Sequence, residues 1–218
     1  MTISKTISKS SPKTFATLLL ATTAALTLPG AAFADIVASA ITPLNIRSGP
    51  GPEHAVVGYI PQNAQIAVAG CVQGSLWCRV SYQGHSGWAY SQYMTGNVAG
   101  RSVVISQAIT QVPTVTYQVP VEATTAMAAA PPPITGTIVQ RPAEAPPLDI
   151  TPPPTVRQYV VSNPVTPVYL NGEVVVGAGL PADVTLTPVP DYQYQYAYVN
   201  GQPVLVEPQS RRVTYIYR

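Results

Sequence analysis

Apolar and polar residues alternate over short stretches between residues 35 and 96, which is typical of β-strands with one buried face. Leu44 and Ile46 alternate with Asn45 and Arg47, and Ser48-Gly49-Pro50-Gly51 then forces a turn, because Gly permits positive φ and Pro lacks an amide donor. About five strands at this spacing predict a small antiparallel barrel. The other strand-like stretches are residues 35–40, 55–60, 65–71, 76–82 and 87–90.

The last two of these stretches are expected to form a hairpin. A two-residue turn at Gln83-Gly84 pairs Trp77 with Tyr90 and Arg79 with Trp88, so these four side chains project from one face. Such a face has two interpretations: a ligand-binding groove for sugars or peptides, or a structural cover that closes the end of a small barrel. We favour the structural cover but keep the four residues as the candidate ligand-binding residues.

The last sixty residues contain two hairpin signals. Asn171-Gly172 and Asn200-Gly201 each lie between runs of β-forming residues, and both turn positions of such hairpins take positive φ. Residues 212–217 are expected to add a closing strand. We therefore predict a small antiparallel β-sheet module over residues 157–218.

Tyrosines recur at every second position before the second Asn-Gly pair. Tyr192, Tyr194, Tyr196 and Tyr198 are expected to share one face of a strand, with Leu205 opposite Tyr196. This face is either an aromatic binding strip or a packed surface, and we favour packing.

The stretch between these two regions is rich in proline. The chain has 24 prolines in 218 residues, and many of them lie in residues 97–156 among Ala and Thr. Such a sequence cannot bury enough apolar area to offset chain entropy, so we predict a disordered Pro/Ala/Thr-rich linker over 97–156. It acts as a spacer or as a plain tether.

The N-terminus has the pattern of a secretory signal peptide. All three lysines lie between residues 5 and 13, and an apolar stretch follows over residues 15–28. That stretch is too short to span a bilayer, and Ala32-Phe33-Ala34 forms a small-x-small cleavage site before Asp35. We predict a signal peptide over residues 1–34 and a periplasmic or secreted protein without a membrane span in the mature chain.

The remaining charge excludes one class of partner. Residues 35–218 hold eight arginines against nine acids, a net charge of −1, with no basic cluster. A phosphate backbone needs such a cluster, so nucleic-acid binding is not expected.

Cys71 and Cys78 are the only cysteines in the sequence, and they flank a six-residue hairpin loop. Opposed positions on neighbouring strands lie within disulfide reach, and an exported protein meets oxidants. A metal-binding or reactive thiol pair is the alternative, but only two histidines exist in the chain to support it. We predict a disulfide and no metal or cofactor.

The barrel region resembles bacterial SH3 (SH3b) domains. The resemblance rests on the strand and turn at residues 44–51, on Leu76-Trp77-Cys78-Arg79-Val80-Ser81-Tyr82, and on Gly87-Trp88-Ala89-Tyr90 followed by Tyr93-Met94. It implies an SH3-like barrel over residues 35–96. It also implies a possible association with peptidoglycan or wall peptides.

The C-terminal residues resemble a domain of unknown function found in small exported bacterial proteins, often behind an SH3b domain. The resemblance rests on residues 174–181, 187–191, 196–201 and 204–213. It implies an architecture and no activity.

No catalytic motif accompanies these elements. The sequence has no Gly-rich phosphate loop, HExxH, GxSxG or CxxC motif, and its acids are scattered among turns. We therefore expect an all-β, non-enzymatic cell-envelope protein that binds peptidoglycan or wall peptides. A protein-interaction or structural protein of the periplasm is the alternative.

Overall fold

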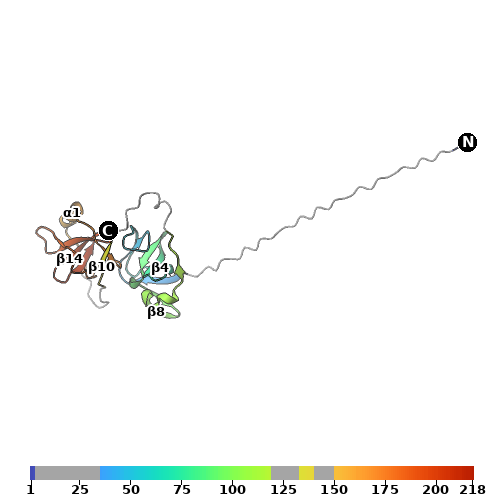
Figure 1. Ribbon diagram of the computed structural model, residues 1–218, viewed down its shortest axis with the longest axis horizontal. Coiled ribbons are helices and arrows are strands. Elements are labelled where there is room, and N and C mark those ends of the chain that lie inside the picture. The colour runs from blue at the N-terminus through green and yellow to red at the C-terminus, as the bar shows by residue number, and fades with distance from the viewer. Residues whose placement is uncertain (3–34, 119–132, 140–149) are drawn as a thin grey trace. The chain divides into compact units, whose positions relative to one another are not determined.

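The computed structural model describes residues 1–2, 35–118, 133–139 and 150–218 (Figure 1). The chain separates into the units Met1–Ala32 and Phe33–Arg218, and the description below concerns the second. The predicted signal peptide and its cleavage residue Ala34 lie outside the described residues, except for residues 1 and 2. Within the described ranges, no helix has the length and hydropathy needed to cross a membrane.

The first part of this unit, residues 36–98, is the predicted barrel of short antiparallel strands. Its strands follow the order β3-β2-β6-β5-β4-β1-β7 across one sheet, so β3 lies at an edge. Leu44, Ile46 and Val80 fill the interior. The elements are β1 (Ile36–Ala40), β2 (Leu44–Arg47), β3 (Val56–Ile60), β4 (Gln65–Val72), β5 (Trp77–Tyr82), β6 (His85–Tyr90), the 3-10 helix η1 (Ser91–Tyr93) and β7 (Met94–Val98).

The hairpin between β5 and β6 has the predicted register. Trp77 pairs with Tyr90, and Arg79 pairs with Trp88. The turn residues Gln83 and Gly84 both have positive φ, 47° and 83°, as a tight two-residue turn requires. The turn therefore sets the register of the whole hairpin.

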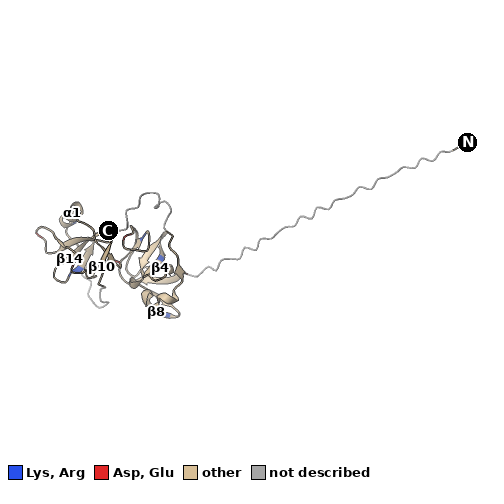
Figure 2. Ribbon diagram, in the orientation of Figure 1, with Lys and Arg blue, Asp and Glu red and all other residues tan. Residues whose placement is uncertain are grey.

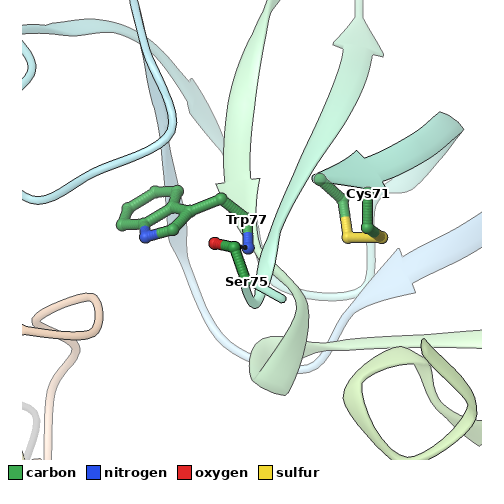
Figure 3. The surroundings of a disulfide bond; sticks show 4 residues. Cys71, Ser75 and Trp77 are labelled. Carbon is green, nitrogen blue, oxygen red and sulfur yellow. Dashed lines mark hydrogen bonds between the residues drawn. A yellow bond between two sulfur atoms is a disulfide. The ribbon is translucent and has the colours of Figure 1, made fainter. Parts of the chain in front are cut away.

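The predicted disulfide joins β4 and β5 (Figure 3). Cys71 and Cys78 lie directly opposite each other in the antiparallel ladder. The loop between them is closed by a second contact, in which the amide of Trp77 donates to the hydroxyl of Ser75 at 3.2 Å. The disulfide prediction is confirmed.

The chain continues in regular structure beyond the barrel, where the sequence predicted a disordered linker. β8 (Arg101–Val104) pairs with β7, η2 (Ile105–Gln111) follows, and β9 (Thr114–Val115) pairs in parallel with β4. Ile105 is fully buried, so this segment contributes apolar area to the barrel core despite its weak periodicity. The linker prediction is wrong for this segment, while residues 119–132 and 140–149 of the predicted linker lie outside the described residues.

The C-terminal module, residues 150–218, combines one helix with an antiparallel sheet. The sheet order is β12-β13-β14-β15, and β11 pairs in parallel with β10, which also lies in the predicted linker. The all-β prediction holds apart from the helix, whose first residues were assigned to the linker. The strand β10 (Ile134–Thr137) precedes the module, whose own elements are α1 (Pro154–Ser162), β11 (Tyr169–Asn171), β12 (Thr187–Pro188), β13 (Gln195–Val199), β14 (Gln202–Glu207) and β15 (Arg212–Ile216).

The helix α1 packs on the tyrosine face of this sheet. Tyr196 is almost fully buried, and it lies opposite Leu205 as predicted. The hydroxyl of Tyr196 donates to the carbonyl of Asn163 at 2.8 Å, and that of Tyr198 donates to the carbonyl of Val160 at 3.2 Å. These carbonyls belong to the C-terminal end of α1, where backbone acceptors lack intrahelical donors. Packing is therefore the role of Tyr196 and Tyr198.

The two Asn-Gly signals have different outcomes. Asn200-Gly201 forms the predicted hairpin between β13 and β14. Asn171-Gly172 does not, because β11 ends there and residues 173–176 form no strand with it. The first predicted hairpin of the module is therefore wrong.

One hydrophobic core runs through the barrel, the following segment and the C-terminal module. It contains Leu44 and Trp88 from the barrel, Ile105 from the following segment, and Leu170 and Val206 from the C-terminal module. The prediction of two modules held apart by a linker is therefore wrong. Charge is sparse across the described chain, and almost all of the ribbon in Figure 2 is tan.

Candidate functional site

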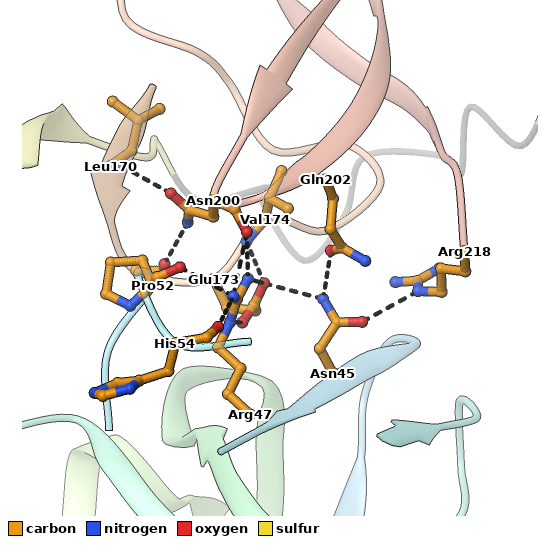
Figure 4. Close-up of polar contacts among 11 residues, drawn as sticks. Asn45, Arg47, Pro52, His54, Leu170, Glu173, Val174, Asn200, Gln202 and Arg218 are labelled. Carbon is orange, nitrogen blue, oxygen red and sulfur yellow. Dashed lines mark hydrogen bonds and ion pairs between the residues drawn. The ribbon is translucent and has the colours of Figure 1, made fainter. Parts of the chain in front are cut away.

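The polar side chains of β2 meet the C-terminal module in a buried cluster (Figure 4). Nε of Arg47 donates to Oε2 of Glu173 at 2.5 Å, and its second terminal nitrogen donates to Oε1 at 2.8 Å. Side-chain exposures are 1% and 0%, so the ion pair is shielded from water. A carboxylate and a guanidinium in this two-point geometry form a strong charge-assisted contact.

Arg47 has acceptors for all of its donors. Nη1 donates to the backbone carbonyls of Pro52, His54 and Asn200, and Nη2 also donates to the carbonyl of Asn200. A buried arginine is tolerated only when its remaining N–H groups are satisfied in this way. Because no donor is left over, Arg47 ties the turn after β2 to the C-terminal module and has no group available for a ligand.

Asn45 extends the cluster toward the end of the chain. Its amide nitrogen donates to Oε1 of Glu173 at 3.1 Å and to the amide oxygen of Gln202 at 2.7 Å. Its oxygen accepts from Nε of Arg218 at 3.3 Å. The buried cluster therefore orients Arg218 at its outer edge.

A cleft of about 670 Å³ opens beside this cluster. Its walls include the rings of Tyr59, Tyr169 and Tyr217, together with Glu53 and Arg218. The guanidinium of Arg218 lies 4.7 Å from the centroid of the exposed Tyr59 ring, which is cation–π geometry. Burial lowers the pKa of Arg218, but the group remains a cation at neutral pH.

Two polar atoms at this cleft lack hydrogen-bond partners among the described residues. They are Oε2 of Glu53 and the hydroxyl of Tyr217, and both atoms are buried. Burial also raises the pKa of Tyr217 to about 12, so its hydroxyl is a neutral donor and acceptor across the physiological range. Unsatisfied buried polar atoms are rare in folded proteins, and these two lie in residues that line the cleft but are themselves shielded from it.

Two family models match the parts of the chain that build this cleft. Residues 42–95 match the bacterial SH3 domain, and residues 159–218 match a domain of unknown function, DUF1236. This chain carries a bacterial SH3 domain followed by a DUF1236 domain. Both resemblances read from the sequence are thereby confirmed.

A curated relative matches a part of this chain. It is a protein of Bacillus subtilis (strain 168) named "Putative N-acetylmuramoyl-L-alanine amidase YrvJ", 39% identical over 61 residues. The match covers 28% of this chain and 11% of the relative, so this chain spans about a tenth of that protein's length.

The four candidate ligand-binding residues of the SH3 domain share one face as predicted, but that face is covered. Trp77, Trp88 and Tyr90 are 3%, 1% and 6% exposed, whereas Arg79 is exposed. The guanidinium of Arg79 lies 5.9 Å from the Trp88 ring centroid. The three rings therefore act as a structural cover. The alternative interpretation, an open aromatic groove, does not fit their burial.

The cover over Trp88 comes from the chain beyond the SH3 domain. The ring of Tyr117 meets Trp88 edge to face at a centroid distance of 5.6 Å, and it meets His54 at the same distance. Tyr117 lies in the stretch predicted to be disordered. The sequence therefore did not indicate that Tyr117 covers part of the aromatic face.

The residues that sequence reasoning missed are Asn45, Arg47 and Glu173. Asn45 and Arg47 occupy the alternate positions of β2, which the pattern assigns to a solvent-facing side. Glu173 follows the first Asn-Gly pair and was placed in an ordinary strand. The available signal was an acid placed directly beside an apolar run, Val174 to Val176, because an acid next to buried strand residues calls for a partner.

Proposed function

We propose that this protein is a non-enzymatic, exported cell-envelope protein whose SH3 domain binds peptidoglycan or wall peptides in the cleft beside Arg218. The observation that carries the proposal is the placement of the Arg218 guanidinium over Tyr59 in a cleft that Glu53 and Tyr217 also line. The cleft volume of 670 Å³ lies within the range of ligand pockets, about 300–1,000 Å³.

The cleft has the chemistry for a peptide that carries a carboxylate. Arg218 supplies a cation for the carboxylate, and the exposed ring of Tyr59 supplies an apolar surface. Glu53 and Tyr217 also line the cleft, with a carboxylate and a hydroxyl group. Wall peptides contain the carboxylate, amide, amine and apolar groups that suit these side chains.

The curated relative supports the link to the cell wall. Its printed name describes an N-acetylmuramoyl-L-alanine amidase. The Cys71–Cys78 disulfide supports export, because structural disulfides persist in oxidising compartments. We propose binding without catalysis, since the most buried carboxylate, Glu173, is engaged by Arg47 and Asn45.

Co-sedimentation of the mature protein with purified peptidoglycan tests this proposal. We expect wild type to sediment at low salt and less at high salt, because an accessible charge contact is screened by ions. Arg218→Ala should weaken sedimentation several-fold. Arg79→Ala is the matched control: it removes an exposed arginine away from the cleft and should sediment like wild type.

Three outcomes would change the conclusion. If wild type with an intact disulfide fails to sediment at low salt, wall binding is refuted, and the protein-interaction alternative becomes the better account. If Arg79→Ala loses binding and Arg218→Ala does not, the assignment of the cleft is refuted while wall binding stands. If both variants bind like wild type, the arginine contact is refuted.

A further inference from the structure

A second cleft of about 560 Å³ has a different chemical character. It is lined by the turn between β1 and β2, by η1, by β8 and η2, and by Val175 of the C-terminal module. No charged side chain is among the described residues that line it. Seven of its ten lining residues carry a hydroxyl or an amide group, and the other three are Ile41, Val104 and Val175.

The polar groups of this cleft come from separate elements. Gln62 follows β3, Gln92 lies in η1 and Gln107 lies in η2. Gln62 uses its amide nitrogen to donate to the carbonyl of Ile41 at 3.1 Å, which leaves its amide oxygen as an acceptor. The side chains of Gln92 and Gln107 make no hydrogen bond to another described residue, and each carries an amide donor and an amide acceptor.

This combination selects for neutral, hydroxyl-rich ligands. An amide side chain presents a donor and an acceptor side by side, and a sugar hydroxyl both donates and accepts, so the two groups match. An anion or a cation would lose its hydration without finding an opposite charge, which is costly in a partly enclosed site. The apolar side chains offer contact area for the C–H face of a pyranose ring.

We propose that this cleft is a second binding site, which takes an uncharged saccharide. It lies apart from the cleft beside Arg218, with which it shares no lining residue. The site is complete only when the SH3 domain, η2 and Val175 are assembled together. This gives the segment after the SH3 domain a binding role that its low-charge, Pro-rich sequence did not indicate.

The proposal does not depend on wall-peptide binding, and the two are tested separately. Chitotetraose is the probe, because it is an uncharged glycan with no peptide and no carboxylate. Titration of the isotope-labelled mature protein, followed by NMR, should shift the side-chain amide signals of Gln62, Gln92 and Gln107. A hyaluronan tetrasaccharide, which carries carboxylates, should bind at least several-fold more weakly.

Two variants and one control locate the site. Gln92→Ala and Gln107→Ala should each weaken chitotetraose binding by up to about tenfold, as expected for the loss of one or two hydrogen bonds. Gln73→Ala removes an exposed glutamine in the loop closed by the disulfide and should bind like wild type. Gln92 and Gln107 are not buried, so the thermal stability of both variants should be unchanged. A loss of binding then cannot be attributed to unfolding.

Several results would overturn the proposal. They are an absence of shifts at millimolar chitotetraose, shifts gathered around Tyr59 and Tyr217, equal binding of the charged tetrasaccharide, or wild-type affinity in both glutamine variants. Failure of peptidoglycan co-sedimentation would leave this result unaffected, because the probe contains none of the groups assigned to Arg218.

Discussion

Asn171-Gly172 and Asn200-Gly201 are the same dipeptide in the same module, yet they form different structures. At Asn200-Gly201 both residues have positive φ, 53° and 76°, and β13 and β14 pair on either side. At Asn171-Gly172 only Gly172 has positive φ, 103°. The strand before it, β11, pairs in parallel with β10 instead of with the residues that follow.

The difference lies in what the next residues contact. Gln202, after the second pair, continues directly into β14, whereas Glu173, after the first pair, turns into the buried cluster with Arg47. Asn200 also holds the first pair in place: its Nδ2 donates to the carbonyl of Gly172 at 3.0 Å and its Oδ1 accepts from the amide of Leu170 at 2.8 Å. Leaving Arg47 buried without Glu173 would cost more than losing one turn preference, so the tertiary contact decides.

Breaking the ion pair should have the largest effect. Glu173→Ala leaves Arg47 buried without its carboxylate, and we expect the free energy of unfolding to fall by about 3–5 kcal/mol. Urea unfolding followed by circular dichroism measures this. Glu53→Gln is the control, because the Glu53–His54 pair is about one-quarter exposed and should contribute less than about 1 kcal/mol.

A rescue variant separates the charge from the packing. Combining Arg47→Met with Glu173→Leu replaces the pair by apolar side chains and should recover most of the loss. A Glu173→Ala variant as stable as wild type would show that the cluster does not hold the SH3 and DUF1236 domains together.

Exchanging the two asparagines for alanine should separate their roles. Asn200→Ala removes two buried hydrogen bonds and puts Ala, which tolerates the left-handed region less well than Asn, at φ 53°, so we expect a loss of about 2–4 kcal/mol. Asn171→Ala changes an exposed side chain and should stay within about 0.5 kcal/mol of wild type. Asn200→Gly keeps the turn and loses only the hydrogen bonds, so it should lie between them; equal losses at both asparagines would contradict the comparison.

Removing the disulfide compares a local constraint, the Cys71–Cys78 bond, with the long-range contact between Arg47 and Glu173. Cys71→Ala with Cys78→Ala opens a short loop, and the chain-entropy model gives a loss of about 2–3 kcal/mol. Amide hydrogen exchange should rise in β4 and β5, while residues 171–176 keep their protection relative to global stability. Two free thiols in protein isolated from its natural compartment would refute the bond altogether.

High pH should act on both regions, with a small effect near pH 10 that grows toward pH 12. Burial raises the pKa of Tyr93 in the SH3 domain and raises that of Tyr217 in the DUF1236 domain to about 12, whereas tyrosines of the unfolded chain titrate near pH 10. Above pH 10 the unfolded state therefore loses protons that the folded state keeps, and the free energy of unfolding falls as pH rises toward 12. Urea midpoints between pH 8 and 12 measure the slope, and Tyr217→Phe should make it shallower; a constant midpoint would contradict the assignment.

Much of the SH3 domain was predictable from local patterns. The Gln83-Gly84 turn determines which residues of β5 and β6 face each other, and the Cys71–Cys78 spacing places the two sulfurs on opposite strands. The Tyr196–Leu205 pairing followed in the same way from Asn200-Gly201. Each of these features depends on residues within one hairpin, where chain connectivity limits the possible partners.

The candidate sites were less predictable. The four residues around Trp88 form the face that was expected, but Tyr117 covers it, and the clefts are built from segments assigned to a linker or to another domain. Low charge and high proline content indicate poor core formation on average. They do not exclude a short segment such as η2 that packs onto an existing barrel.

The sequence by itself determined the strands of the SH3 domain, the registers of the β5–β6 and β13–β14 hairpins, the disulfide and the two domain families, because each of these is encoded by neighbours along the chain. Only the tertiary structure decided that Asn45, Arg47 and Glu173 are buried, that the two domains share a core, and that the clefts exist. The physical reason is that a charged side chain is buried only with a partner, and the partner of Arg47 lies 126 residues away in the chain.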